Sequence, residues 1–247
     1  MIHIRNASEV EKISRSCQIV KETMDMIEEL VQPGITTLEL DNKAEGFIRS
    51  KGAYPGFKGL YGYPATLCVS IDDEVVHGLP SNRKLKEGEI LSVDVGSLLD
   101  GFYGDHAKSF SVGDVDEGRT ELMKITNECL YDGINQAIPG NRIGDISHAV
   151  QIKAEAHGYG VVRDLVGHGI GTNLHEEPQI PNFGLPDKGP IIESGMCFAI
   201  EPMINLGSPD VYTKKDGWTI CTNDGLPSAH FEHTITITEK GAKILTI

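Results

Sequence analysis

Five potential metal ligands, each inside a short apolar or glycine-rich segment, limit how this 247-residue chain can fold. The segments are ILSVDVG, GDHAKSF, VGHGIG, FAIEPM and HFEHT, and the side chains are Asp94, Asp105, His168, Glu201 and Glu232. Charged groups in apolar surroundings are costly unless they are neutralised, so the fold has to gather them around a partner. Four carboxylates and one imidazole can hold two neighbouring divalent cations, and such a pair activates water for hydrolysis. In this order, the five segments together predict a dinuclear metal centre.

The first two carboxylates are predicted to lie on neighbouring strands. Apolar residues alternate with others along Ile90–Gly96, so Asp94 projects away from the apolar face. Asp100-Gly101 is a strong signal for a two-residue hairpin turn. In the absence of a bulge, that turn places Asp105 opposite Gly96, on the same face as Asp94 and roughly 7–8 Å from it between Cα atoms. Like charges so placed are costly unless a cation neutralises them, which favours a metal site.

The last two carboxylates also interrupt strand-like segments. Residues 229–238 alternate between an apolar face and a second face that carries Glu232 in mid-strand. Glu201 follows the apolar run Met196–Ile200, a pattern typical of a strand buried on both faces, and we expect this strand to span 197–204. A lone carboxylate there would be desolvated at considerable cost, so a partner is required and a cation is the simplest one.

Composition is that of a compact enzyme rather than a nucleic-acid or membrane protein. The formal net charge is −14, with 36 acidic against 22 basic residues, which argues against a nucleic-acid partner or binding to an anionic membrane. The five cysteines are scattered and never form C-x-x-C, as expected for reduced thiols in a cytoplasmic protein. The beginning of the chain lacks the apolar region of a signal peptide, and no apolar run reaches transmembrane length. We therefore expect a cytoplasmic protein.

The predicted elements indicate an α+β fold in one domain, residues 1–247. The first helix should begin at a capping box formed by Ser8 and Glu11 and end just before Pro33. Three more helices are expected, from the capping box Thr36–Glu39 to Gly52, over Glu117–Ala137, and from Pro139-Gly140 to Gly158. Strands are expected at 66–71, 90–96, 102–112, 197–204, 218–222 and 229–238. Helices separate from antiparallel hairpins in this pattern, unlike in an alternating parallel sheet.

An internal echo suggests that the domain is built from two similar halves. Pro33-Gly34 and Pro139-Gly140 each precede a helix, 106 residues apart. Glu87-Gly88 and Ser194-Gly195 each precede a strand with a predicted ligand, 107 residues apart. These offsets predict a pseudo-repeat with halves at roughly 10–112 and 116–240, although identities between the halves are few.

Over essentially its whole length the chain resembles the type I methionine aminopeptidases. The resemblance rests on the five ligand segments and on three further stretches: VHGLP at 76–80, GHGIGTNLHEEPQ at 167–179 and KDGWT at 215–219. No zinc-finger extension precedes the helices, as in the short bacterial form. The resemblance implies a pita-bread fold with a pseudo-two-fold axis, which would account for the echo. It also implies removal of the initiator methionine from new polypeptides when the N-terminus is deformylated and the second residue is small and uncharged.

Site roles follow from the same resemblance. Asp105 and Glu232 would bridge two divalent cations, Asp94 would complete one cation site, and His168 and Glu201 the other. A hydroxide between the cations would attack the scissile carbonyl, with the substrate's α-amine on the cation held by Asp94. Glu201 also matches the proton shuttle. His77 and His175 match two histidines that contact the substrate and the tetrahedral intermediate, and an unligated imidazole can indeed donate to a developing oxyanion. The cations would be Co²⁺, Mn²⁺, Fe²⁺ or Zn²⁺, and hard oxygen ligands favour the first three.

The methionine pocket departs from the usual pattern of these enzymes at two positions. Tyr63, Cys68 and Trp218 match pocket residues, although Trp218 is almost equally well explained as core packing. Leu174 stands where an aromatic residue is common, and Leu60 replaces a frequent tyrosine, with Phe57 as a candidate compensation. All of these remain apolar, so a flexible thioether should still fit.

Two alternatives carry the same fold. Proline-directed dipeptidases and X-Pro aminopeptidases use the same five ligands but generally have an additional N-terminal domain. Binding or chaperone proteins of this fold have lost ligands that are intact here. We therefore expect a monomeric aminopeptidase that meets the N-termini of nascent polypeptides, with the ribosome nearby.

Overall fold

The computed structural model describes residues 1–247 and contains four α-helices and one 3₁₀ turn. The helices are α1 (Ala7–Leu30), α2 (Thr37–Ser50), α3 (Glu117–Gln136) and α4 (Ile143–Ala156), and the 3₁₀ turn η1 is Leu60–Gly62. The strands of the first part are β1 (Tyr54–Pro55), β2 (Leu67–Ile71), β3 (Glu74–Val76), β4 (Ile90–Leu99), β5 (Phe102–Ser111), β6 (Gly160–Val161), β7 (Gly167–Gly169) and β8 (Glu176–Ile180). The later strands are β9 (Cys197–Ile200), β10 (Met203–Asn205), β11 (Val211–Thr213), β12 (Ile220–Thr222), β13 (Ser228–His230), β14 (Glu232–Thr238) and β15 (Gly241–Ile244).

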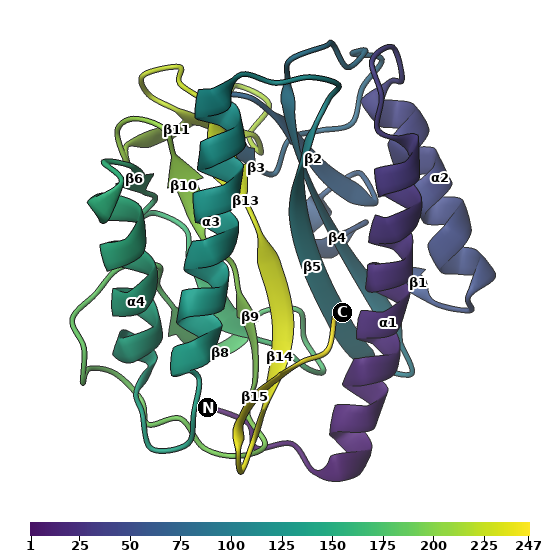
Figure 1. Cartoon of the computed structure of the whole chain (residues 1–247). Coiled ribbons are helices and arrows are strands. Elements are labelled where there is room, and N and C mark those ends of the chain that lie inside the picture. Colours follow the sequence, from purple (N-terminus) through teal and green to yellow (C-terminus); the bar gives the residue numbers. More distant parts are fainter.

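One large antiparallel sheet forms the centre of the molecule. Its strands follow the order β1-β4-β5-β14-β9-β7-β8, with β2 added beside β4 and β15 beside β14. Two three-stranded sheets, β13-β10-β6 and β11-β12-β3, lie beside it. All four helices lie against one side of the large sheet (Figure 1). α1 packs on β4 and β5 and α2 on β1 and β2, while α3 packs on β5, β9 and β15 and α4 on β8. The α+β prediction is confirmed. None of the four helices combines the length and the hydropathy that a membrane-spanning helix needs.

Local capping sets where the helices begin. The side chain of Asn6 accepts from the backbone N–H of Glu9, and the Glu9 carboxylate accepts from the N–H of Asn6, at 3.1 and 2.9 Å. The capping box of α1 is therefore this pair, and the prediction of Ser8 with Glu11 is wrong, because Asn6 caps the helix two residues earlier. The predicted box of α2 is confirmed, with Thr36 as its N-cap. One face of α1 is buried against the sheet and carries Ile13, Cys17, Val20, Met24 and Ile27.

The β4–β5 hairpin has the predicted register. Asp100 and Gly101 both have positive φ angles, 51° and 80°, as a type I′ turn requires. Gly96 lies opposite Asp105, and no bulge interrupts the ladder between the two strands. Asp94 and Asp105 therefore project from the same face of the sheet.

Two predicted strands are interrupted beside the carboxylates that they carry. The strand expected at 197–204 divides into β9 and β10, and that expected at 229–238 divides into β13 and β14. β9 pairs with β14 in the large sheet, whereas β10 pairs with β13 in a small one. The segments 197–205 and 228–238 therefore pass from one sheet to the other side by side. Pro202 lacks an N–H for a ladder hydrogen bond, which explains the break after Glu201. Glu201 and Glu232 consequently lie at the junction of two sheets rather than in mid-strand.

The strand expected at 218–222 is shorter than predicted. The Asp216 carboxylate accepts hydrogen bonds from the backbone N–H groups of Trp218 and Thr219, at 2.8 and 2.9 Å. This turn occupies the N–H groups that a longer strand would need, so β12 begins only at Ile220. Trp218 is thereby placed on a loop.

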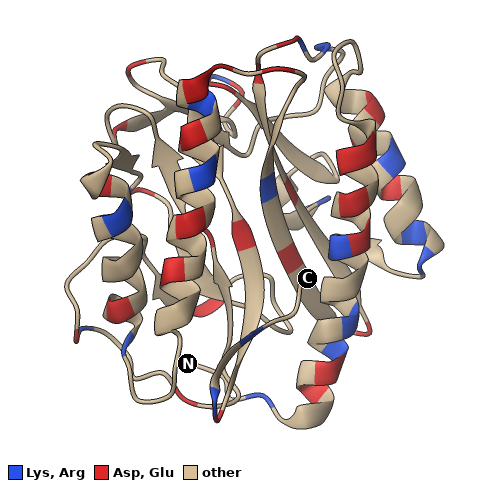
Figure 2. Ribbon diagram, in the orientation of Figure 1, with Lys and Arg blue, Asp and Glu red and all other residues tan.

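Acidic residues occupy two different environments. Figure 2 shows them on the helices, in keeping with the net charge of −14, and also within the middle strands of the large sheet. Carboxylates on helix surfaces are solvated and need no explanation, but those in the sheet are desolvated. The desolvated carboxylates in the strands therefore mark the candidate functional site.

Candidate metal centre

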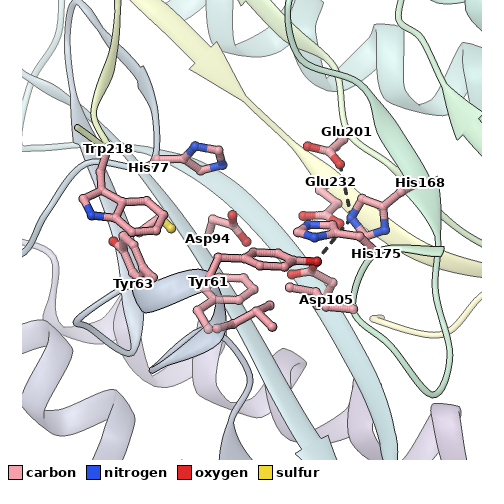
Figure 3. A pocket seen from close by; sticks show the side chains of 14 residues that line it. Tyr61, Tyr63, His77, Asp94, Asp105, His168, His175, Glu201, Trp218 and Glu232 are labelled. Atoms are coloured by element: carbon pink, nitrogen blue, oxygen red, sulfur yellow. Dashed lines mark ion pairs between the residues drawn. The ribbon is translucent and has the colours of Figure 1, made fainter. Parts of the chain in front are cut away.

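All five predicted ligands line one pocket. They come from β4, β5, β7, β14 and the end of β9, and Figure 3 shows Asp94 between the carboxylate–histidine group and an apolar wall. Asp105 and Glu232 reach the pocket from adjacent strands, since Glu232 pairs with Ala107 of β5. His168 comes from β7, which pairs with β9 immediately before Glu201. The antiparallel ladders thus bring together residues that are up to 138 positions apart in sequence (232 − 94).

The ligand atoms are close enough to share cations. One ligand atom from each of Asp105, His168 and Glu232 lies within 4.8 Å of the others. His168 Nε2 is 3.4 Å from Glu201 Oε1 and 3.8 Å from Asp105 Oδ2 (Figure 3). Divalent transition metals bind such nitrogen and carboxylate ligands at about 2.0–2.2 Å, so ligand atoms about 3–4.4 Å apart can share one ion.

Burial and mutual repulsion raise the pKa values of the carboxyl groups. Asp105 and Glu232 are 4% and 2% exposed. Desolvation is the main cause of the raised pKa of Asp105, followed by the charges of Glu232 and Asp94. Desolvation also raises the pKa of Glu201 and Glu232, with their carboxylate neighbours adding to the effect. Bound cations would offset this repulsion and lower the pKa values of the carboxyl groups, because the charge of the ions dominates such a site.

Several polar atoms at the centre have no hydrogen-bond partner. They are buried oxygen atoms Oδ1 of Asp94, Oδ1 of Asp105 and Oε1 of Glu232, together with Nε2 of His230. Burying acceptors without partners is costly, and native proteins rarely leave three in one place. Cation ligation satisfies such oxygen atoms, so the residues present fit a divalent-metal centre.

The strand alternation places two other histidines behind the centre. His106 and His233 follow Asp105 and Glu232, and their rings stack on the opposite face of the sheet, 4.9 Å apart between centroids. His106 Nδ1 contacts the Glu232 carbonyl oxygen, and His233 Nε2 lies 3.3 Å from the hydroxyl of Tyr131 on α3. His106 therefore points away from the centre, and His233 packs behind the proposed ligands.

Two histidines without a ligand position border the pocket, as expected. His77 has a positive φ of 59° at the end of β3, and desolvation lowers its pKa to about 4. His175 lies at the opening, with its ring edge-on to His168 at 4.5 Å between centroids. A neutral imidazole carries one N–H, so His77 can donate a hydrogen bond at neutral pH.

An apolar wall completes the pocket. It is formed by Phe57, Leu60, Tyr63, Cys68, Leu174 and Trp218. The Tyr63 hydroxyl donates toward the carbonyl oxygens of Leu67 and Gly78, at 2.8 and 3.0 Å, and its ring meets Trp218 edge-on. Trp218 therefore lines the pocket and also packs against Tyr63. Both interpretations of this residue, as a pocket residue and as a packing residue, apply. Leu60 and Leu174 form part of this wall, and neither side chain adds a polar group to it.

Two residues near the proposed ligands, Tyr61 and His230, were not predicted as site residues. Tyr61 lines the pocket, is 74% exposed and stacks on His175 at 5.8 Å between ring centroids. Its left-handed backbone, with φ 52°, turns it toward the opening, and nothing in the sequence signals that turn. His230 Nε2 lies 3.8 Å from Glu201 Oε2, because β10 and β13 pair immediately beyond the sheet junction. Only its proximity to Glu232 in the sequence offered a hint.

Comparison with known proteins agrees with this architecture. Residues 11–239 match the model of metallopeptidase family M24. The chain is 46% identical to the crystal structure of a methionine aminopeptidase from Thermotoga maritima, with a TM-score of 0.98 over 100% of this chain and 99% of the other. It is also similar to a prolidase from Pyrococcus furiosus, with a TM-score of 0.80 and 25% identity over 99% of this chain and 65% of the other. The chain belongs to metallopeptidase family M24, and the expected pita-bread fold is confirmed.

Similarity within the family is higher to methionine aminopeptidases than to the prolidase. A methionine aminopeptidase of Clostridium perfringens is 49% identical over 100% of this chain and 99% of its own length. Methionine aminopeptidase 1 of Bacillus subtilis is 47% identical over 100% of this chain and 99% of its own. These full-length similarities place the chain with the methionine aminopeptidases and confirm the resemblance to the short type I form.

Proposed function

We propose that this protein removes the initiator methionine from newly made polypeptides in the cytoplasm. The observation that carries the proposal is the pocket itself, in which the buried carboxylate–histidine centre adjoins an apolar wall. Cys68 of the wall pairs directly with Asp94 across β2 and β4. A substrate side chain in the wall therefore leaves the substrate's N-terminus beside the centre.

The ligand set fits two divalent cations. Asp105 and Glu232 would contact both, Asp94 would complete one site, and His168 with Glu201 the other. Co²⁺, Mn²⁺, Fe²⁺ and Zn²⁺ all suit this mixture of oxygen and nitrogen ligands. Bound cations would supply Lewis-acid polarisation and lower the pKa of water. The chain's own residues then have to position the substrate and move protons.

Proton transfer, oxyanion stabilisation and substrate binding are assigned to other groups of side chains in the pocket. Glu201 can accept a proton at one carboxylate oxygen and return it to the leaving amine. His77 and His175 can donate hydrogen bonds to the oxygen on which charge develops. The wall of Tyr63, Leu174 and Trp218 would hold the thioether, since sulfur packs well against aromatic edges.

The substrate preference can be tested with short peptides. We expect release of methionine from Met-Ala-Ser, but not from its formylated form, because a blocked amine cannot occupy the centre. Second residues such as Gly, Ala or Ser should be accepted and large ones refused. Mass spectrometry of the products with each metal added to metal-free enzyme would measure this. Preferential cleavage before proline would assign the chain to the prolidase-like branch instead.

The number of cations can be tested at the two proposed bridging residues. Asp105→Ala or Glu232→Ala should lower the metal content from two ions per chain and abolish turnover, because only these carboxylates serve both sites. Metal analysis of saturated, desalted protein would measure the stoichiometry. Lys108→Ala, on the same strand with an exposed side chain that pairs with Glu28, is the matched control and should keep both ions. Retention of two tightly bound ions by either bridging variant would refute the assignment.

A further inference from the structure

The turn at residues 171–176, which carries His175, packs against the beginning of the chain. Residues before α1 run under this turn, and the Arg5 backbone N–H donates to the Gly195 carbonyl at 2.8 Å. The Arg5 side chain is 6% exposed and forms an ion pair with the Glu176 carboxylate, which is 5% exposed. We infer that Arg5 and Glu176 are positioning residues that fix His175 in its catalytic orientation. This inference rests on the oxyanion role proposed for His175.

Glu176 ties the turn together with both of its carboxylate oxygens. Oε2 meets the Arg5 guanidinium, while Oε1 accepts from the Asn173 backbone N–H at 3.0 Å and the Thr172 hydroxyl at 3.1 Å. One side chain thus links the N-terminal segment to both ends of the turn. Charge-assisted hydrogen bonds of this kind are stronger than neutral ones and fix geometry.

Arg5 also packs directly against the backbone of the turn. A Cβ atom at Gly171 would lie 2.3 Å from Arg5 Nη2, so only glycine allows the guanidinium to lie there. The Gly171 carbonyl oxygen in turn accepts from the Tyr103 N–H of β5 at 2.8 Å. The turn is therefore clamped between β5 and the Arg5 side chain.

The clamped turn presents His175 to the centre. Glu176 faces Arg5, and the adjacent His175 faces the pocket, where its ring lies edge-on to His168 and parallel to Tyr61. Neither ring contact is a hydrogen bond, so the backbone of the turn determines where the imidazole points. Displacement of a catalytic group by about 1 Å can reduce the rate by about 10²-fold.

A double-mutant cycle separates positioning from general stability. Arg5→Met should lower kcat by about 10- to 100-fold with little change in KM, because it releases the turn without touching the apolar wall. Glu176→Gln should act in the same direction, and Arg5→Lys should restore part of the activity because it keeps the charge. Combined with His175→Ala, Arg5→Met should have no further effect on kcat, since the residue it positions is absent.

Arg15→Met is the matched control. Arg15 forms an exposed ion pair with Asp100 at 2.9 Å, with side chains 55% and 51% exposed, so its loss should leave kcat unchanged. Activities are compared per folded molecule, using circular dichroism and metal content. Multiplicative losses in the His175→Ala background, or full activity of Arg5→Met, would overturn the inference while leaving the proposed function intact. Failure of the wild-type enzyme to release methionine would overturn both.

Discussion

Glu201 has two different neighbours on its two carboxylate oxygens. Oε1 lies 3.4 Å from His168 Nε2, and Oε2 lies 3.8 Å from His230 Nε2. Desolvation lowers the pKa of both histidines to about 3, so both rings are neutral at physiological pH. Neither histidine is therefore a positively charged partner that would hold Glu201 ionised, so a proton can be placed on Glu201 during turnover. This arrangement suits a residue that is both ligand and proton carrier.

Replacing Glu201 should affect turnover more than metal binding. Glu201→Gln keeps an oxygen ligand but loses the proton-accepting group, so kcat should fall by at least about 10²-fold. Metal content from inductively coupled plasma analysis and kcat on Met-Ala-Ser would be measured together. Glu193→Gln serves as the control, since Glu193 lies outside the pocket. Near-normal kcat with full metal loading would exclude the proton-transfer role.

Single residues were predictable where chemistry alone marks them. The five proposed ligands stand out because carboxylates rarely occur in apolar strands without a partner. Tyr61 and His230 lack such a signal, since one depends on a left-handed turn and the other on pairing between distant strands. The roles of the predicted residues remain predictions that the variants above address.

The close approach of the segment after β3 to β2 shows how neighbouring elements position a site residue. Gly78 follows His77 and approaches β2 so closely that a Cβ atom would lie 2.0 Å from the Val69 carbonyl oxygen. The Val69 N–H donates to the Gly78 carbonyl oxygen at 2.9 Å, and the Tyr63 hydroxyl donates to the same oxygen. The backbone after His77 is thereby fixed against the wall of the pocket.

A methyl group at Gly78 should displace His77. Gly78→Ala has to push the chain away from β2, so kcat/KM should fall by about 10²-fold or more, as expected when an oxyanion donor is lost. The control is Gly46→Ala in α2, where a Cβ atom meets nothing within 4 Å and helix propensity favours alanine by about 1 kcal/mol. Steady-state kinetics and thermal unfolding of both variants would be compared. Equal activity of the two variants would contradict the close-approach argument.

Element boundaries were predictable where the causes are local. Thr36 and Asp100-Gly101 set a helix start and a hairpin turn from side chains within a few residues. Pro202 is a local cause of the break after Glu201, but the change of sheet depends on β13 lying beside β10, and no local pattern shows that pairing. The same reason explains why Glu232 was expected in mid-strand.

At the scale of the molecule, the metal centre is the main concentration of unfavourable charge. Four carboxylates share one pocket in a chain with a net charge of −14. Cations that bind only the folded state stabilise it by mass action, by about 2.7 kcal/mol at 100 times the Kd. We therefore expect cation binding and folding to be coupled in this chain.

Removal of the metal should lower the melting temperature. For a chain of this length, about 2.7 kcal/mol corresponds to a Tm change of about 5–10 °C. Differential scanning calorimetry with chelator, and after re-addition of Mn²⁺ or Co²⁺, would measure the shift. In Asp105→Ala the same additions should shift Tm less, which excludes non-specific ion effects. An unchanged Tm would argue against a structural contribution of the cations.

The two-sheet junction beside Glu201 and Glu232 has a consequence for how this chain tolerates insertions and deletions. Side chains alternate along a strand, so adding or deleting one residue reverses the face of every residue beyond that point. A one-residue deletion at Pro202 would therefore reverse the faces of β10 relative to β9, and one at Phe231 would reverse those of β14 relative to β13. All five proposed ligands would remain in the sequence, but the carboxylate at the junction could not keep its place while both sheets kept theirs. At the opposite end of these strands, the turn between β14 and β15 contains exposed residues and can absorb such a change. The metal centre thus depends on the count of residues between its ligands as strictly as on their identity.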